Sequence, residues 1–346
     1  MCELLGMSFN QPVRPSLSFR GFRHRGERNP DGWGIAYYPD ESVQVIKEPI
    51  KASKSLLSEF IMKYPKSKIF IAHVRYSSGS SVTYKNTHPF QRELNGREFV
   101  FAHNGTLHNY RGFNTGRFKP VGETDSEYAF CHILNSIENE RISSWTDKNF
   151  KWLHNKLNEI NEFGNFNCLL SDGEYLFCYY DKNGHNGLCF VQRKAPFNIV
   201  HLKDEDFEIN LSEKKDPSQK GFIIATRRLT DERWENFLPA ELMVFKNGEI
   251  IFSSSGRDTE SFFTLPQNIE LNILKVLRQS PHRMSLKSIY QTLNLPKAEI
   301  IPAIHSLLCK GYINQDSRDK VKWVQDDATF YTEQSKREEI DGLIGK

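Results

Sequence analysis

The segment FNCLLSDGEYLFCYYD (residues 166–181) places two apolar runs on either side of an Asp-Gly pair. Glycine supplies the positive φ that a tight hairpin turn requires, so this pattern predicts two antiparallel strands. A second turn signal, Asn-Gly at 247–248, divides the apolar runs of ELMVFKNGEIIFS (241–253) in the same way. Short apolar runs of this kind recur from the N-terminus to about residue 255. We therefore expect a largely antiparallel sheet structure.

Helical periodicity interrupts these strands at three places. In residues 55–65 the expected apolar face consists of Leu56, Leu57, Phe60 and Ile61. The other two helices are expected over residues 125–139 and 147–160. Many strands with a few long helices predict a layered α+β domain, which we place at residues 1–258.

The sequence changes character after this domain. A linker is expected at 259–268, followed by three amphipathic helices near 269–279, 285–294 and 297–311 and a hairpin in YINQDSRDKVKWV (312–324). Three helices and a hairpin in so few residues are typical of a winged helix, which we place at residues 269–326. Residues 327–346 are highly charged and are expected to form a C-terminal tail or a short terminal helix.

Composition excludes several classes of protein. The net charge is only +3, from 46 basic and 43 acidic side chains, so neither nucleic acid nor an anionic membrane is expected as the main partner. No run of apolar residues is long enough to span a membrane, and the N-terminus lacks a secretion signal, which predicts a cytoplasmic protein. The six cysteines show no CxxC pairing, so neither a zinc site nor a disulfide framework is expected. Four of them have apolar neighbours and are expected to be buried: Cys131, Cys168, Cys178 and Cys189.

Cys2 stands at the position that becomes the N-terminus when Met1 is removed, and its small side chain favours that removal. The residue would then carry a thiol nucleophile and an α-amine with a reference pKa near about 8. An N-terminal nucleophile can be activated by its own amine. Taken alone, Cys2 is more simply explained as an incidental second residue.

Five further stretches, in order, resemble the class II glutamine amidotransferases, which are N-terminal nucleophile (Ntn) hydrolases. These stretches are MCELLGMS (1–8), HRGERNPDGWGIAYY (24–38), AHVRYSSGS (72–80) followed by NTHPF (86–90), FAHNGTL (101–107) and GETDSEYAF (122–130). The resemblance is greatest to the stand-alone, YafJ-like members and extends to about residue 255. It implies a four-layer αββα sandwich, with Cys2 as the catalytic nucleophile and no cofactor or metal.

The resemblance also assigns roles to residues whose chemistry fits them. Asn104 and Gly105 would donate hydrogen bonds to the oxyanion of a tetrahedral intermediate, although an Asn-Gly turn alone would explain the pair. Arg75 would bind the α-carboxylate of glutamine as a planar bidentate donor. Asp125 would bind its α-ammonium, although an acid at this point is also a routine helix cap.

Other polar residues are expected to act around these groups. His88 and His103 are interpreted as structural or supporting hydrogen-bonding residues, and a metal site or a serine-type triad is less favoured for them. Arg25 would help to hold a thiolate, or is simply solvated. Asp31 would line the pocket wall, or marks a tight entry into a strand. The chain departs from the family at Ser80, where glycine is usual, so the loop that closes over glutamine is expected to differ.

The function expected is hydrolysis of the glutamine side-chain amide to glutamate and ammonia through a γ-glutamyl thioester. Hydrolysis of another γ-glutamyl amide or peptide is an open alternative, and a separate ammonia-accepting enzyme is a possible partner. An alternative of another class is a DNA-binding or scaffold regulator with an inactive amidotransferase domain. The winged helix would then supply phosphate contacts from Lys297, Lys310, Arg318, Lys320 and Lys322, although its modest charge favours protein interaction.

Overall fold

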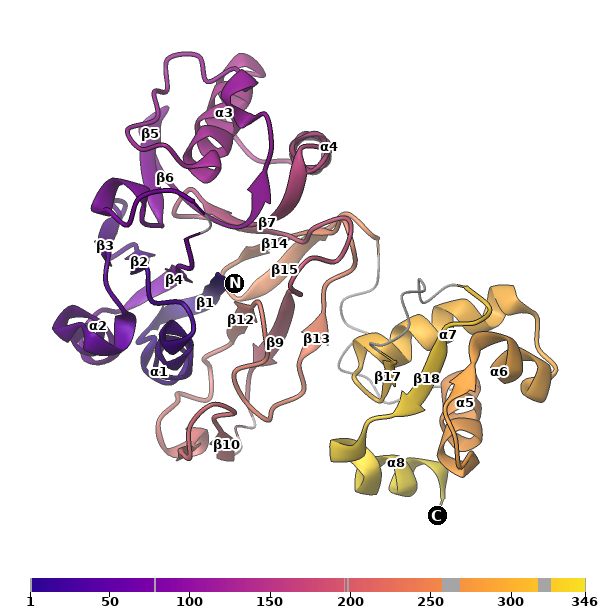
Figure 1. Ribbon diagram of the computed structural model, residues 1–346. Coiled ribbons are helices and arrows are strands. Elements are labelled where there is room, and N and C mark those ends of the chain that lie inside the picture. The colour runs from indigo at the N-terminus through magenta and orange to yellow at the C-terminus, as the bar shows by residue number, and fades with distance from the viewer. Residues whose placement is uncertain are drawn as a thin grey trace. The chain divides into compact units, whose positions relative to one another are not determined.

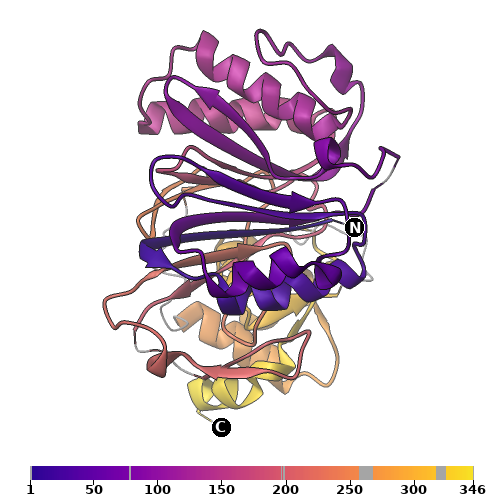
Figure 2. The same ribbon diagram turned by 90° about the vertical axis from the view of Figure 1, so that its left-hand side faces the viewer.

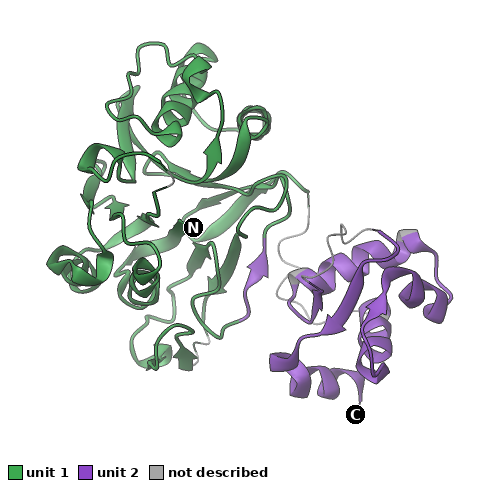
Figure 3. Cartoon of the chain, in the orientation of Figure 1, with its two compact units in different colours: residues 1–232, 237–257 green, residues 233–236, 258–346 purple. Residues whose placement is uncertain are grey.

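The computed structural model of the protein describes residues 2–77, 79–195, 197, 199–256, 268–316 and 325–345. Figure 1 shows its elements, which comprise antiparallel sheets and long helices. This arrangement confirms the expected α+β class. The chain divides into two compact units, residues 1–232 with 237–257 and residues 233–236 with 258–346 (Figure 3). Among the described residues, no helix has the length and apolar character needed to cross a bilayer.

The first sheet has β1 near its centre. Within the first unit its strand order is β9-β12-β1-β4-β2-β3, and all neighbouring strands are antiparallel. The strands are β1 (Glu3–Val13), β2 (Trp33–Tyr37), β3 (Gln44–Glu48), β4 (Ser67–Val74), β9 (Cys189–Arg193) and β12 (Gly221–Ala225). Because β1 starts at Glu3 between two paired neighbours, the N-terminal end of the chain is fixed inside the sheet.

The second sheet contains both predicted hairpins. Its order is β15-β14-β8-β7-β6-β5, with β5 (Phe90–Leu94), β6 (Arg97–Leu107), β7 (Gly164–Ser171), β8 (Leu176–Tyr179), β14 (Leu242–Lys246) and β15 (Glu249–Ser253). The β7–β8 turn has Gly173 at φ 89°, and the β14–β15 turn has Asn247 and Gly248 at φ 48° and 74°. A smaller pair, β10 (Ile199–His201) and β11 (Glu208–Asn210), lies between β9 and β12 in the sequence.

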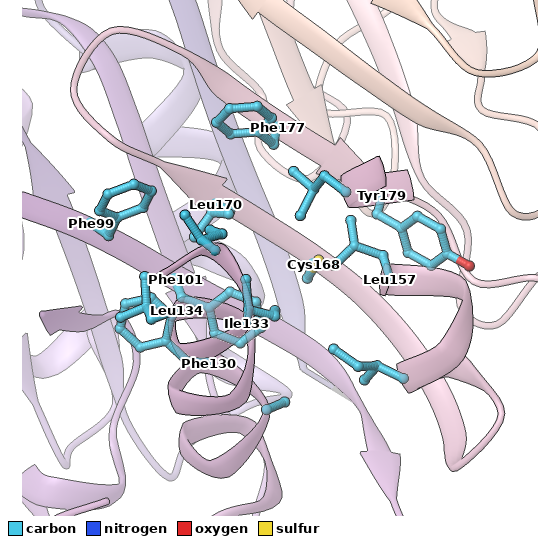
Figure 4. Packing of buried hydrophobic residues seen from close by; sticks show 14 of the residues in the cluster. Phe99, Phe101, Phe130, Ile133, Leu134, Leu157, Cys168, Leu170, Phe177 and Tyr179 are labelled. Carbon is cyan, nitrogen blue, oxygen red and sulfur yellow. The ribbon is translucent and has the colours of Figure 1, made fainter. Parts of the chain in front are cut away.

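Helices cover the outer faces of both sheets. The first unit therefore has four layers, in the order helices, sheet, sheet, helices (αββα; Figure 2). Helices α3 (Asp125–Asn139) and α4 (Asp147–Asn161) lie on the second sheet, and α1 (Ser16–His24) and α2 (Leu56–Lys63) lie on the first. Figure 4 shows the core under α3 and α4, where Phe101 and Phe130 stack with ring centroids 5.3 Å apart. The four cysteines expected to be buried are at most 4% exposed.

The predicted apolar face of α2 is wrong. The helix forms, and Ser55 caps it by accepting a hydrogen bond from the backbone of Ser58. Only Ser58 and Ile61 are buried, however, whereas Leu56 is 82% exposed and Phe60 is 45% exposed. The reason is a set of polar contacts: the Ser58 hydroxyl donates to the carbonyls of Ala52 and Ser55, in the turn just before the helix, and this side of α2 faces inward.

The second unit contains the three predicted helices, α5 (Asn268–Gln279), α6 (Leu286–Leu293) and α7 (Lys297–Cys309). A three-stranded sheet has the order β16-β18-β17, formed by β16 (Met284–Ser285), β17 (Ile313–Gln315) and β18 (Thr329–Thr332). The unit also includes the two-residue strand β13 (Glu235–Asn236). This order of helices and strands is the one expected of a winged helix, an assignment that stays a prediction.

The C-terminal segment differs from a simple charged tail. Strand β17 pairs with β18, which lies beyond the predicted hairpin, and residues 317–324 lie outside the described residues. A further helix, α8 (Arg337–Ile344), buries Ile340 and Ile344 against the core of this unit. Residues 327–345 thus form part of the folded unit, because these apolar side chains recur at helical spacing among the charges. The predicted linker lies almost wholly outside the described residues.

Candidate active site

Cys2 directly precedes β1, and its surroundings fix both its thiol and its carbonyl. The thiol sulfur accepts a hydrogen bond from the backbone N–H of Tyr76 at 3.1 Å and lies 3.2 Å from the Tyr76 carbonyl oxygen. The Cys2 carbonyl accepts from Asn104 Nδ2 at 2.7 Å and from Asn186 Nδ2 at 3.0 Å. Burial raises the pKa of the Cys2 thiol, while the Tyr76 hydrogen bond and the Arg75 charge act in the opposite direction. The thiol therefore needs a base to become a nucleophile.

Asn104 and Gly105 lie on β6, beside β7. The carboxamide of Asn104 reaches Cys2, as the contact with the Cys2 carbonyl shows. At Gly105, an added Cβ would lie 1.9 Å from the carbonyl oxygen of Asn165 and 2.6 Å from His103 Nε2. The pair is therefore not a free turn. Glycine is required here because the backbone of β7 and the ring of His103 leave no room for a side chain.

Arg75 follows the end of β4 and is 3% exposed. Its Nη2 donates to Ser80 Oγ at 2.6 Å and to the Ser81 carbonyl at 3.3 Å. The carboxylate of Asp31 accepts from the backbone N–H of Ser77 at 2.8 Å, so Asp31 holds the start of the same loop. Ser80, the residue that departs from the family pattern, thus contacts the guanidinium directly, which glycine in that position cannot do.

Asp125 is the first residue of α3, but it does not cap this helix. Thr124 is the N-cap, and its hydroxyl accepts from the backbone of Glu127. One oxygen of Asp125 accepts from the Leu107 N–H at 2.7 Å and the other from the Ser126 N–H at 2.9 Å. The carboxylate is half-buried and connects the start of α3 to β6, two residues beyond Gly105.

Three buried histidines lie behind these groups. His103 contacts Ser126 Oγ at 2.8 Å and the Asn165 carbonyl at 3.1 Å. The rings of His73 and His88 lie 4.2 Å apart, and burial lowers the pKa of His73 to about 3 and that of His88 well below its usual value. Burial also lowers the pKa of His103, so all three are neutral near pH 7. Within the described part of the chain, no group of three or more His, Cys, Asp or Glu is placed to hold a metal ion.

Arg25 binds residues other than Cys2. Its Nη1 donates to Glu3 Oε2 at 2.7 Å, and Nη2 donates to the Arg228 carbonyl at 2.6 Å. A further bond at 2.9 Å runs from Nε to Asp204. The guanidinium therefore holds Glu3, the residue after Cys2, against the segment that follows β12.

Sequence reasoning missed the loop between β8 and β9, DKNGHNG (residues 181–187). The buried carboxylate of Asp181 accepts from the backbone N–H groups of Phe166, Asn183 and His185. This arrangement directs Asn186, at φ 56°, toward the Cys2 carbonyl. The two Asn-Gly pairs in this loop were the available signal, because they predict left-handed backbone in a tight turn.

The structure thus brings Cys2, Asn104, Asn186 and the backbone beside Arg75 to one place. Asp125, on α3, accepts a hydrogen bond from Leu107 of β6, the strand that carries Asn104. This arrangement and the antiparallel four-layer fold define a class of protein. Residues 1–267 match the family model of class II glutamine amidotransferases, and the chain belongs to this family.

Individual relatives agree with this assignment. The chain is 50% identical to the uncharacterized protein MJ1515 of Methanocaldococcus jannaschii, over 99% of this chain and 96% of MJ1515. It is 40% identical to YafJ of Escherichia coli (strain K12), which carries a glutamine amidotransferase name, over 72% of this chain and 99% of YafJ. A predicted glutamine amidotransferase from Pseudomonas aeruginosa PA01 has a crystal structure that superposes with a TM-score of 0.56 at 33% identity, covering 72% of this chain and all of that one.

Proposed function

We propose that the chain hydrolyses the side-chain amide of glutamine with the thiol of Cys2 as the nucleophile. Family membership supports glutamine amide chemistry in general. The observation that carries the finer proposal is the convergence on Cys2: Tyr76 donates to its sulfur, and Asn104 donates to its carbonyl. The thiol is thus held by backbone on one side, and the Asn104 carboxamide lies beside the residue that carries the thiol.

The reaction begins when the thiol proton passes to the α-amine of Cys2, which removal of Met1 exposes. The sulfur then forms a bond to the amide carbon, and the oxyanion accepts hydrogen bonds from the Asn104 carboxamide and the Gly105 backbone N–H. The C–N bond breaks, and the protonated amine gives its proton to the leaving ammonia. Water, deprotonated by the same amine, cleaves the γ-glutamyl thioester to release glutamate and restore the thiol.

Arg75 and Asp125 recognise the amino-acid end of the substrate in this proposal. A guanidinium suits the α-carboxylate, and a carboxylate suits the α-ammonium. Arg75 precedes Tyr76, which contacts the thiol, and Asp125 bonds to the strand that carries Gly105. Both groups would bind any γ-glutamyl compound in the same manner, so another γ-glutamyl amide remains an alternative substrate. Ammonia released here would serve a separate partner enzyme.

The rival proposal of a DNA-binding regulator loses one of its expected phosphate contacts. Lys310 is 3% exposed and donates to both carboxylate oxygens of Glu270, at 2.7 and 2.9 Å. Lys297 pairs with Asp326. Arg318, Lys320 and Lys322 lie outside the described residues. With Lys310 internal, protein interaction is the better proposal for this unit.

A combined mass and activity experiment tests the proposed function. Intact mass of the purified protein reports whether Met1 is absent, and coupled assays measure glutamate and ammonia released from glutamine. Removal of Met1 with equal amounts of both products is expected, and Cys2→Ala should abolish turnover. Activity of Cys2→Ala equal to that of the parent would overturn the proposal.

The head-group assignment has a matched pair of variants. Arg75→Lys keeps the charge but loses the bidentate fork, so KM for glutamine should rise about tenfold or more. Arg111→Lys makes the same chemical change at an exposed position and should leave KM unchanged. An unaltered KM in Arg75→Lys would contradict the assignment.

A further inference from the structure

The first unit contains a cavity of about 420 Å³ on the outer face of the first sheet. Side chains alternate along β1: an added Cβ at Gly6 would contact Leu169 of the second sheet, so its odd-numbered neighbours Met7 and Phe9 face the other way. Both line this cavity, together with the turn into α1 and the segment after β11. Phe9 lies seven residues along the chain from Cys2, or about 23 Å at the rise of an extended strand. The cavity is therefore separate from the candidate active site in both direction and distance.

Cationic side chains dominate the polar lining. They are Arg14, Lys66, Arg193, Lys214 and Lys215, against a single acid, Asp216. Arg193 is neutralised by Glu232, and Asp216 accepts hydrogen bonds from the N–H and hydroxyl of Ser218. Within the described ranges, the other four cations have no ion-pair partner. Four unpaired charges around one cavity are notable in a chain whose whole net charge is +3.

Lys215 is the most informative of these side chains, because it is half-buried rather than free in solvent. Its ammonium lies 5.6 Å from the centroid of the Phe9 ring, and its backbone N–H donates to the Leu211 carbonyl at 2.9 Å, which fixes its place in the turn. Burial, and then the charge of Arg193, lowers the pKa of Lys215 to about 8. The carboxylate of Glu232, which is paired with Arg193, acts in the opposite direction but does not offset the burial, and a bound anion would reduce the remaining cost.

Apolar side chains make up much of the remaining lining, beside the neutral polar side chains of Gln11, Ser16, Ser18 and Gln219. The apolar ones include Met7, Phe9, Val13, Leu17, Ile209 and Leu211, four of which belong to β1 or the start of α1. A volume of this size suits a small metabolite, and binding sites of this kind combine apolar walls with a few charged groups. The walls would take an apolar or aromatic body, and the four cations would take an anionic group carried by it.

We propose that this cavity is a binding site for a small organic phosphate that has an apolar or aromatic body. Phosphate is the preferred anionic group because a dianion can be bound by several of the four cations at once, whereas a carboxylate carries one charge. The site lies on the face of β1 opposite the second sheet, so its ligand is not the substrate that Cys2 attacks. It is independent of the proposed glutamine chemistry.

Phenyl phosphate is a suitable probe, compared with inorganic phosphate, benzoate and phenol, in titration calorimetry of the full-length protein. Phenyl phosphate should bind saturably and more tightly than each of the other three, since only it offers both a ring and a dianion. A carboxylate site would instead favour benzoate over phenyl phosphate, and an apolar site would bind phenol equally well. Either of these two results would overturn the phosphate assignment.

Variants locate the binding. Lys215→Met should weaken phenyl phosphate binding about tenfold, the effect expected from loss of one charge-assisted contact. Arg14→Gln, at an exposed position, tests the same site without altering a buried side chain.

The matched control is Lys148→Met on α4, which removes one exposed charge on the other sheet's outer layer and should leave affinity unchanged. Absence of saturable binding, or equal affinity in Lys215→Met and Lys148→Met, would overturn the proposal. Glutaminase activity is measured in parallel, and its loss or retention in Cys2→Ala does not bear on this site.

Discussion

The side-chain amide of Asn186 donates to the backbone carbonyl of Cys2 at 3.0 Å, across 184 positions of sequence. Asn104 donates to the same oxygen at 2.7 Å, so two carboxamides from different elements hold the residue that carries the thiol. The Oδ1 atom of Asn186 is buried, and none of the described residues gives it a hydrogen-bond donor. The free amine of Cys2 would be a donor of the kind that this oxygen lacks.

Asn186→Ala should therefore reduce kcat/KM for glutamine by about tenfold to a hundredfold, the value of one or two lost hydrogen bonds to a buried group. The loop would still form, because Asp181 rather than Asn186 organises it. The measurement is steady-state kinetics together with the pH dependence of kcat, which should shift if the amine loses an acceptor. Asn183→Ala changes an exposed asparagine of the same loop and should have parent activity. Equal kinetics for the two variants would contradict a positioning role for Asn186.

Gly105→Ala should destabilise the fold as well as abolish activity. The new methyl group would lie 1.9 Å from the Asn165 carbonyl oxygen, so β6 and β7 would have to separate. A loss of about 3 kcal/mol or more is expected, at or beyond the upper end of ordinary overpacking. Urea unfolding measures it. Gly112→Ala is the control, since nothing lies within 4 Å of a Cβ built there. Comparable free energies of unfolding for both variants would disprove the steric argument.

Much of this fold was predictable because its determinants are local. The Asp-Gly and Asn-Gly turns at 172–173 and 247–248 require particular backbone angles, and those angles are observed. The helical faces of α3 and α4 follow from apolar spacing. The face of α2 could not be predicted from its apolar residues, because Ser58 is buried through hydrogen bonds with the carbonyl of Ala52 in the turn before the helix and with the Arg23 side chain of α1.

The candidate site residues Cys2, Arg75 and the Asn104-Gly105 pair were singled out by the resemblance to the amidotransferases, because each of them taken alone has a simpler explanation. The structure places the Asn104 carboxamide and the backbone beside Arg75 against Cys2, and the catalytic and binding roles stay predictions. Asn186 carries no such signal, since its role comes from a loop held by Asp181. The contact of Ser80 with Arg75 was likewise hidden, because a serine in a loop gives no indication of its partner.

Acid should destabilise the first unit between pH 6.5 and 5. Burial lowers the pKa values of His73, His88 and His103 in the folded state, so the unfolded chain binds more protons as the pH falls below about 6.5. Stability is then lost at up to about 1.4 kcal/mol per pH unit for each histidine. His201 acts in the opposite direction, because Asp231 and Glu208 raise its pKa, but it is exposed and its effect is screened.

Urea unfolding at a series of pH values measures this loss. The free energy of unfolding should fall steadily from pH 6.5 to pH 5, before most carboxylates titrate. His108→Gln, which replaces an exposed histidine, should follow the same curve as the parent protein. A flat profile over this interval would show that the three buried histidines do not gain protons on unfolding.

Lys215→Met should make the protein more stable near pH 7 when no anion is bound. The folded state holds the pKa of this ammonium at about 8, against an ordinary value of 10.5, so the charged form is disfavoured by folding. The cost is fully present below pH 8 and disappears as the pH rises through 10.5, since the lysine is then neutral in both states. Arg193 and Glu232 are the charged groups that face Lys215, and their opposing effects leave burial as the main cause of its lowered pKa.

After allowance for screening, Lys215→Met is expected to gain on the order of 1 to 3 kcal/mol in free energy of unfolding, measured with urea at pH 7, with no gain at pH 10.5 or above. Excess phenyl phosphate should narrow the difference, because it stabilises the parent more than the variant, which binds it about tenfold more weakly. A variant less stable than the parent at pH 7 would show that Lys215 already has a compensating partner.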